Sequence, residues 1–473
     1  MLVFFSYAFR LPALVNAAAT NSDAAIVGLQ AMHILRGEYS LFLLGSGYQT
    51  SVDSFVAAAF FLVLGPTPFA LMFSALTLHV IATVLAYATL ARRLPAWTAV
   101  IVSLTLVFTG STIHGYALYP PRQMALTLVF AAIWLIDGAR GRRELVRFGL
   151  GAMAASLACF ADPYALLFTP VIALHVVLTA CDGLSSWATR GRRVLASIAG
   201  AVVGALPISL LVKSSRSQHG EATLATHVFD HNLKLLTSDC LPWALSTKVY
   251  VAQHMMDYAP WTPPRVLVWF QLVAAVVAAV LVASGGALFF YRRLPWEVRR
   301  LGLVGFASVP VTIGGFLVSV MVMDHFSTRY LAAMLLMLPF ALAPIAHLAP
   351  RRSLALALAP WLVSAGVAGW VGYAPFVDGV RIRTDYPGTF HDDERVGAML
   401  RARGVHAAVA DYWASYRLSF LYREDPIVVP SHDVQDRYAP HRREVERATS
   451  YAYIVDPLRS DESAEKVEER LRA

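Results

Sequence analysis

The chain has 473 residues, of which 57% are hydrophobic and only 15% are charged, and its mean hydropathy is +0.56. Soluble domains have roughly a quarter of their residues charged, so this composition excludes an ordinary soluble enzyme and predicts a membrane protein. The formal net charge of +8 would fit a nucleic-acid-binding protein only if the excess lay on one folded surface. The positions of the arginines along the chain argue against that, so we expect no nucleic-acid partner.

Apolar runs of about 20 residues, long enough to cross roughly 30 Å of hydrocarbon as helices, recur along most of the chain. With a short run at the start they predict eleven transmembrane helices, of which the later ones end near Leu90, Phe108, Ile136, Phe160, Ala180, Leu211, Phe290, Val322, Ala346 and Ala374. Arg10 interrupts the first run, which also lacks a charged inner flank. We therefore expect either that this first helix is short or that the sequence begins inside it.

Arginines cluster in alternate loops between these runs. They are Arg92, Arg93, Arg140, Arg142, Arg143, Arg147, Arg190, Arg192, Arg193, Arg292, Arg293, Arg299, Arg300, Arg351 and Arg352. The positive-inside rule assigns such loops to the cytoplasm, so the other loops face outward. Two outward segments are long, at about residues 20–53 and 214–265.

The first outward segment begins with Asn21, Ser22 and Asp23, which together form a helix-cap signature. Apolar residues then recur at three- and four-residue spacing, which predicts a helix lying along the membrane surface. Asp23 either caps this helix or, because it directly follows the first span, presents its carboxylate at the outer membrane boundary. A lipid-linked substrate would carry its head group at that depth.

Three further places in the outward loops contain candidate ligand residues. Arg122 is a candidate phosphate ligand, and Asp162 is a candidate substrate-binding residue that also fits a tight Asp-Pro turn. His227 and His231 flank Asp230 at a spacing that could chelate zinc on a helix, but no third ligand is identifiable. We therefore expect no metal site there.

The motif from Asp324 to Tyr330 stands between the ninth and tenth predicted spans and contains His325 and Arg329. A guanidinium can bind phosphate oxygens bidentately at a water-poor interface, so Arg329 has the chemistry of a phosphate ligand. The alternative is an arginine whose charged end snorkels to the membrane surface from a helix end.

The composition changes after the last apolar run, and more than half of the chain's 31 acidic residues lie beyond residue 375. The pattern predicts a small α/β unit with helices at 392–403 and 412–422 and strands at 405–410, 427–429 and 452–455. The predicted organisation is thus a transmembrane domain at 1–375 and a C-terminal domain at 376–473. Eleven crossings that start inside end outside, so we expect this second domain to be extracytoplasmic on a multi-pass protein of the cell (inner) membrane.

The stretch from Asn21 to about Leu90 resembles the beginning of bacterial GT-C superfamily glycosyltransferases that use polyprenyl-phosphate sugars. This class includes protein O-mannosyltransferases and aminoarabinose transferases. In it an acidic residue opens the first outward loop, a glycine- and tyrosine-containing segment follows, and a second acid precedes the next helix. Asp23, the segment containing Tyr48, and Asp53 match these three features in order.

The resemblance implies transfer of a sugar from a polyprenyl-phosphate donor to an extracytoplasmic glycan, lipid or protein acceptor. It implies catalytic roles for Asp23 and Asp53, with Asp23 as the general base of an inverting reaction, and substrate binding by Tyr48. The late motif resembles the start of a late helix in the same class, where Arg329, beside His325 and Tyr330, would meet the lipid phosphate. The class often has a second acid next to the first, but Ala24 stands here, so a divalent metal is conceivable without being indicated.

Two other classes of protein compete with this interpretation. A lipid or sugar transporter or flippase would place ionisable residues or broken helices near mid-membrane, whereas nearly all ionisable residues here fall at predicted helix ends. A noncatalytic scaffold that displays the C-terminal domain would leave the acidic first loop without a reason.

Overall fold

Eight helices in the described part of the chain are long and apolar enough to cross a membrane, which confirms a multi-pass helical membrane protein. The computed structural model describes residues 1–15, 20–110, 112–113, 117–182, 185–214, 224–252, 258–261, 263–373, 390–432, 436–455 and 464–472. The eight are α4 (Pro68–Leu90), α8 (Glu144–Ala161), η3 with α9 (Pro163–Phe168, Thr169–Ala180), α10 (Trp187–Ser214), α13 (Arg265–Ala287), α14 (Trp296–Val318), η8 to α17 (His325–Leu348) and α18 (Arg351–Tyr373). The other three predicted spans form shorter helices, α1 (Leu2–Val15), α5 (Ala96–Val107) and α7 (Gln123–Asp137).

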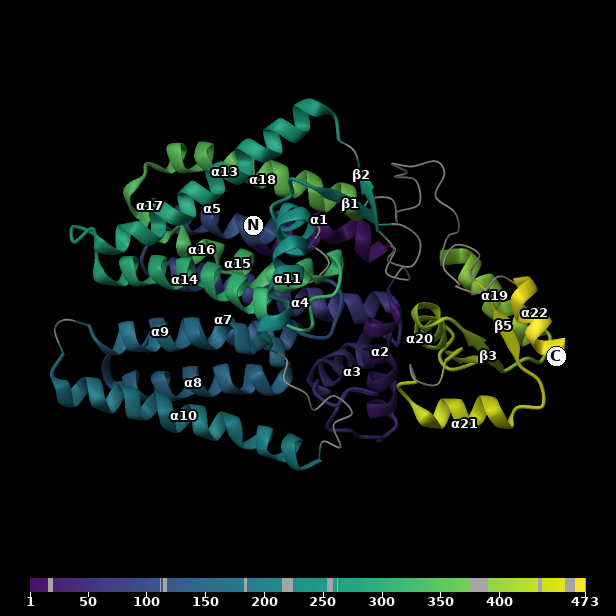
Figure 1. Ribbon diagram of the computed structural model, residues 1–473. Coiled ribbons are helices and arrows are strands. Elements are labelled where there is room, and N and C mark those ends of the chain that lie inside the picture. Colours follow the sequence, from purple (N-terminus) through teal and green to yellow (C-terminus); the bar gives the residue numbers. More distant parts are fainter. Residues whose placement is uncertain are drawn as a thin grey trace.

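The arginine-rich loops meet at one end of the helices, as loops on a common side of a membrane must. Figure 1 shows the turn from α9 to α10 and the turn from α13 to α14 at the same end. There the buried carboxylate of Asp137 accepts hydrogen bonds from Arg93 (2.9 Å) and Arg300 (2.7 Å). Arg140 pairs with Glu297 at 2.7 Å nearby. These ion pairs join loops that are distant in sequence, and each buried charge has a partner.

The second outward segment folds into short elements between α10 and α13. They are α11 (Phe229–Leu235), α12 (Leu241–Ala244), β1 (Val249–Ala252) and β2 (Tyr258–Trp261), and the two strands pair antiparallel. Residues 215–223, 253–257 and 262 of this segment lie outside the described residues. The predicted domain boundary at 375/376 lies outside them too.

The C-terminal unit is the predicted small α/β domain. Its elements are α19 (Phe390–Ala402), β3 (Ala407–Ala410), α20 (Tyr412–Leu421), β4 (Ile427–Pro430), α21 (Ala439–Arg447), β5 (Ala452–Ile454) and α22 (Ala464–Arg472). The three strands are parallel in the order β4-β3-β5, with Ala407 opposite Ile427 and Ala408 opposite Ala452. All five predicted elements are confirmed within a few residues, while α21 and α22 were not predicted.

The helix predicted in the first outward segment is α2 (Ser22–Leu35), and other parts of the protein cover it. Nearly all of its residues are buried, because α3 (Val52–Leu64) and α20 pack against it. A side-chain carbon on Gly28 would lie 2.6 Å from the Phe420 ring, so only glycine lets α20 approach this closely. In Figure 1 the C-terminal domain accordingly lies beside α2 and α3, at the end of the helices opposite the α9–α10 turn.

Candidate functional site

Asp23 lies in the first turn of α2, and another residue caps that helix. The side chain of Asn21 accepts the hydrogen bond of the Ala24 N–H at 2.9 Å, so the capping interpretation of Asp23 is wrong. The Asp23 side chain is 36% exposed, and its Oδ1 accepts hydrogen bonds from the Tyr412 hydroxyl (2.5 Å) and from Arg437 Nη2 (2.9 Å). Both donors belong to the C-terminal domain. The carboxylate is therefore partly exposed, but its Oδ1 atom accepts two hydrogen bonds in this structure.

Arg437 reaches Asp23 because the backbone of Arg437 packs closely against Gly45 of the first outward segment. Gly45 has φ +64°, and a side-chain carbon there would lie 2.5 Å from the Arg437 Cα, so this position requires glycine on both counts. The guanidinium lies 5.7 Å from the centre of the Tyr412 ring. Burial opposes the charge of Arg437, but the Asp23 carboxylate more than offsets this and raises the pKa of the guanidinium.

Tyr48 is influenced by Arg437 and also by residues of the other outward loops. Burial raises the pKa of its hydroxyl, and nearby charged or polar groups act on it from several segments of the chain: Arg122, Asp162, Arg437 and Tyr330. Residues of the α7 and α8 ends, of the late motif and of the C-terminal domain thus all act electrostatically on this tyrosine of the first segment. We call this cluster of residues 23, 48, 122, 162, 330, 412 and 437 the outer site.

Asp53, at the start of α3, is 4% exposed and contacts the turn that carries Arg122. Its two carboxylate oxygens accept hydrogen bonds from the backbone N–H groups of Arg122 (3.3 Å) and Met124 (3.2 Å). These contacts hold the turn that starts α7, in which Arg122 has the left-handed φ of +118°. Its geometry suits a residue that positions Arg122; its predicted catalytic role stays a prediction.

Burial raises the pKa of Asp53 from an ordinary 3.8 to about 6. The folded protein therefore holds this proton more tightly than the unfolded chain does, and stability falls as pH rises from about 4 to about 6. We expect Asp53 to account for roughly 3 kcal/mol of this fall, from about two pKa units. Thermal melts of wild type and Asp53→Asn in detergent between pH 4 and 7.5 measure the effect. The difference between the two melting temperatures should change mainly below pH 6.5, and parallel curves would contradict the assignment.

Asp162 and Arg122 form an ion pair that spans two loops. Asp162 Oδ2 accepts hydrogen bonds from Arg122 Nε (3.2 Å) and Gln49 Nε2 (2.8 Å), while Oδ1 accepts one from the Tyr164 N–H (2.7 Å). The predicted turn role of Asp162 is confirmed by this last contact, which caps η3. The Arg122 guanidinium also lies 5.4 Å from the centre of the Tyr164 ring. Asp162 thus both shapes the turn and orients Arg122.

Only some residues of the late motif, Asp324 to Tyr330, lie near the outer site. The Tyr330 ring lies 6.5 Å from the Tyr164 ring, and Arg329 donates a hydrogen bond to the Tyr330 hydroxyl at 3.3 Å. The Arg329 carbonyl accepts one from the Tyr164 hydroxyl, also at 3.3 Å. His325 instead stacks on Tyr250 of the second outward segment, at 5.2 Å between ring centres. Arg329 therefore borders the outer site, whereas His325 lies in an aromatic cluster beside it.

The sequence interpretation missed two members of the outer site. Tyr412 begins the helix predicted at 412–422, but nothing in the sequence connects it with Asp23. Arg437 carries no local signal, because it is one of many arginines in a charged domain. The interpretation also missed a group that could hold a metal ion, formed by His33, Glu424 and His441.

The chain is similar to solved structures, among them two of the same protein. The crystal structure of ArnT from Cupriavidus metallidurans in the apo state superposes with a TM-score of 0.47 at 11% identity, covering 95% of this chain and 92% of that chain. The crystal structure of the same protein bound to undecaprenyl phosphate gives 0.44 at 11% identity, covering 92% and 86%. No protein-family model matches the chain, and no curated protein matches it. At this level of identity and superposition the likenesses say nothing about which residues act.

Proposed function

We propose that this protein is a membrane glycosyltransferase that moves a sugar from a polyprenyl-phosphate donor to an acceptor on the outer side of the membrane. The observation that carries the proposal is the outer site, where the partly exposed carboxylate of Asp23 pairs with Arg437, and Arg437 and Arg122 both act electrostatically on Tyr48. A base and cationic groups for a phosphate are the parts that this reaction needs. The site lies at the end of the helices opposite the arginine-rich loops, which the positive-inside rule places in the cytoplasm.

In the proposed reaction one carboxylate suffices. The leaving group is a phosphate, which departs with the bonding electrons and needs no proton. Asp23 takes the proton of the acceptor hydroxyl while the acceptor oxygen attacks the anomeric carbon from the face opposite the phosphate. The new glycosidic bond then has inverted configuration.

The arrangement around Asp23 suggests how donor binding and catalysis are coupled. Arg437 holds Oδ1 of Asp23, and a lipid phosphate entering beside Tyr48 would compete for the same guanidinium. Once Arg437 pairs with the phosphate, Oδ1 of Asp23 keeps only the hydrogen bond from Tyr412 and can accept the proton of the acceptor. Arg329, at the border of the site, would add charge to the same phosphate. On this proposal the C-terminal domain is extracytoplasmic and supplies part of the active site.

The decisive experiment incubates purified protein with a panel of polyprenyl-phosphate sugars and acceptor glycans, lipids and peptides. Release of polyprenyl phosphate, matched by a glycosylated acceptor of inverted configuration, is the expected result. Retention of configuration would exclude the single-displacement mechanism. Binding of donors without any release across the panel would contradict the enzyme assignment.

A transporter or flippase is the second candidate, and one observation favours it. Arg10 of α1 is fully buried, and its Nη2 lies 3.3 Å from His79 Nε2 of α4, which places ionisable groups between two helices at membrane depth. Backbone carbonyls of Val107 and Leu106 also accept from Arg10, which suits a structural role equally well. Movement of intact lipid-linked sugar between leaflets of proteoliposomes, without cleavage, would establish this candidate instead.

A further inference from the structure

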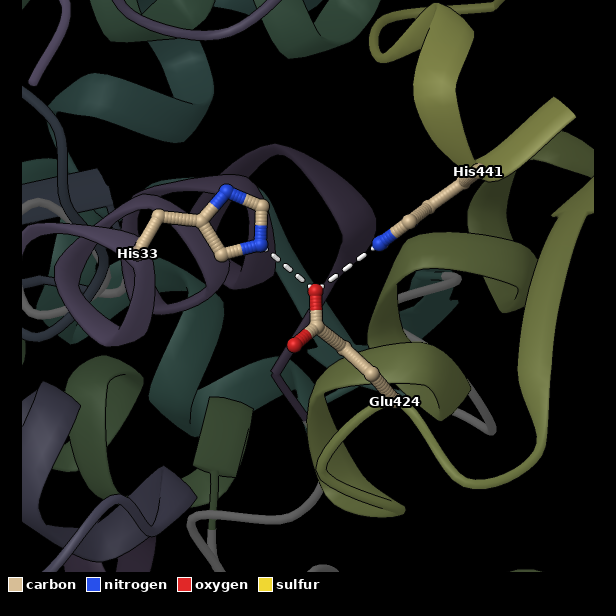
Figure 2. A group of neighbouring side chains, drawn as sticks. All are labelled: His33, Glu424 and His441. Atoms are coloured by element: carbon tan, nitrogen blue, oxygen red, sulfur yellow. Dashed lines mark hydrogen bonds and ion pairs between the residues drawn. The ribbon is translucent and has the colours of Figure 1, made fainter. Parts of the chain in front are cut away.

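Three potential metal ligands from separate elements converge on one point between the two domains. Figure 2 shows the imidazoles of His33, on α2, and His441, on α21, pointing at the same oxygen of Glu424, in the turn after α20. The distances from Oε1 of Glu424 are 2.6 Å to Nε2 of His33 and 2.8 Å to Nε2 of His441. One ligand atom from each residue lies within 4.8 Å of the others.

The surroundings of these three residues resemble the supports of a metal site. Both histidine side chains are 5% exposed, and the Glu424 side chain is 9% exposed. Arg36 pairs with the second oxygen of Glu424, and the Tyr438 ring packs against both imidazoles. Burial opposes the charge of Glu424, but hydrogen bonds from the two imidazoles and Arg36 lower its pKa well below the ordinary value.

A second carboxylate indicates which nitrogen of His33 carries the proton. Glu38 Oε2 lies 3.6 Å from Nδ1 of His33, an ion-pair distance longer than a hydrogen bond, and a carboxylate on this side of a metal-binding histidine favours the tautomer with the proton on Nδ1. Nε2 then presents a lone pair toward the Glu424 oxygen. In this tautomer a cation between Nε2 and the Glu424 oxygen would offset the repulsion of the two lone pairs, whereas in the other tautomer Nε2–H donates a hydrogen bond to Glu424 at the same 2.6 Å.

The cation that fits best is a metal ion. Each imidazole can donate its own N–H to the carboxylate, as the two hydrogen-bond distances allow. A single metal ion at the centre of the triangle would replace both protons, with the three ligand atoms spreading to roughly 3.3 Å from one another. With neutral imidazoles, two carboxylates and one guanidinium leave the group with a net negative charge, which favours a dication. Two imidazoles and one carboxylate suit zinc, at about 2.0 to 2.2 Å from each ligand atom, with a water as fourth ligand.

We propose that His33, Glu424 and His441 bind a divalent transition metal of the Zn²⁺ type that fastens the C-terminal domain to α2. His33 is ten residues from Asp23 on the same helix, about 15 Å along its axis, so the metal would not touch the reacting atoms. It would fix the position of the domain that carries Tyr412 and Arg437. The proposal holds whatever reaction the outer site performs.

Zinc content of the full chain tests the proposal directly. The protein is purified in detergent through a tag without histidines, stripped with a chelator, loaded with Zn²⁺ and dialysed. We expect about one zinc per chain in the wild type. His441→Gln and Glu424→Gln should bind at least about tenfold more weakly, and Glu38→Gln roughly 10- to 100-fold more weakly through loss of histidine orientation. The matched control is His432→Gln, which changes an exposed histidine of the same domain and should keep full zinc.

Two measurements on the wild type keep the proposal testable if a variant does not fold. Co²⁺ in place of Zn²⁺ should give the visible absorption of a tetrahedral site with nitrogen and oxygen ligands, and Zn²⁺ should raise the melting temperature of the stripped protein. Wild-type protein that holds less than about 0.1 zinc per chain, without the Co²⁺ spectrum, would overturn the proposal. Undiminished zinc in folded His441→Gln and Glu424→Gln would overturn it as well.

Discussion

Asp23→Asn should lower the rate of sugar transfer by about 10² to 10⁴, the usual contribution of a general base. An amide keeps the size of the side chain and can still accept the hydrogen bond of Tyr412, so the helix and the domain contact should survive. It cannot take the proton of the acceptor hydroxyl. The measurement is single-turnover release of polyprenyl phosphate from a donor that the wild type uses.

The control for this variant is Asp230→Asn, which changes an exposed aspartate of the second outward segment. It should transfer at the wild-type rate. Both variants must give the same monodisperse elution and a similar melting temperature for the comparison to hold. Near-normal transfer by Asp23→Asn would remove this residue from the mechanism and leave the carboxylate as an anchor for Arg437.

The parts of the fold that follow from local sequence were predicted well. Apolar length alone placed the long helices, and the alternation of arginine-rich loops placed their ends, since Asp137 gathers Arg93 and Arg300 from loops assigned to one side. Strand and helix patterns of the C-terminal domain were also local. Amphipathic α21 escaped notice because Pro440 and a dense run of charges resemble a loop.

The composition of the outer site could be predicted only in part, because its members meet through tertiary structure. Asp23 and Arg437 are 414 positions apart, and no periodic pattern relates them. The fate of α2 illustrates the same limit. Its spacing predicts a helix along the membrane surface. Gly28 and Gly45 admit side chains and backbone of a domain 390 residues later, and this contact helps to bury most of the helix. The sequence alone does not reveal that a glycine is a contact point, because the segment that packs against it is known only from the tertiary structure.

Arg437→Ala should lower kcat/KM by about 10² to 10³, since a cation that meets the charge developing on a leaving phosphate contributes a few kcal/mol. Binding of polyprenyl phosphate, the released product, should weaken roughly 10- to 100-fold, as expected for a hydrogen bond between charged groups. Arg443→Ala, an exposed arginine on α21, is the control and should bind and react normally.

Asp23 and the donor phosphate compete for Arg437 in the proposed mechanism, and this competition leads to a further prediction. In the wild type the phosphate must take the guanidinium from Asp23, so Asp23→Asn, although slow, should bind polyprenyl phosphate more tightly than the wild type does. In an Arg437→Ala background the same Asp23→Asn change should not affect binding, because the competition no longer exists. Titration of the four proteins with polyprenyl phosphate closes this cycle. Equal effects of Asp23→Asn in both backgrounds would show that Arg437 only fastens the C-terminal domain, since a residue that does not leave Asp23 cannot couple the base to the lipid.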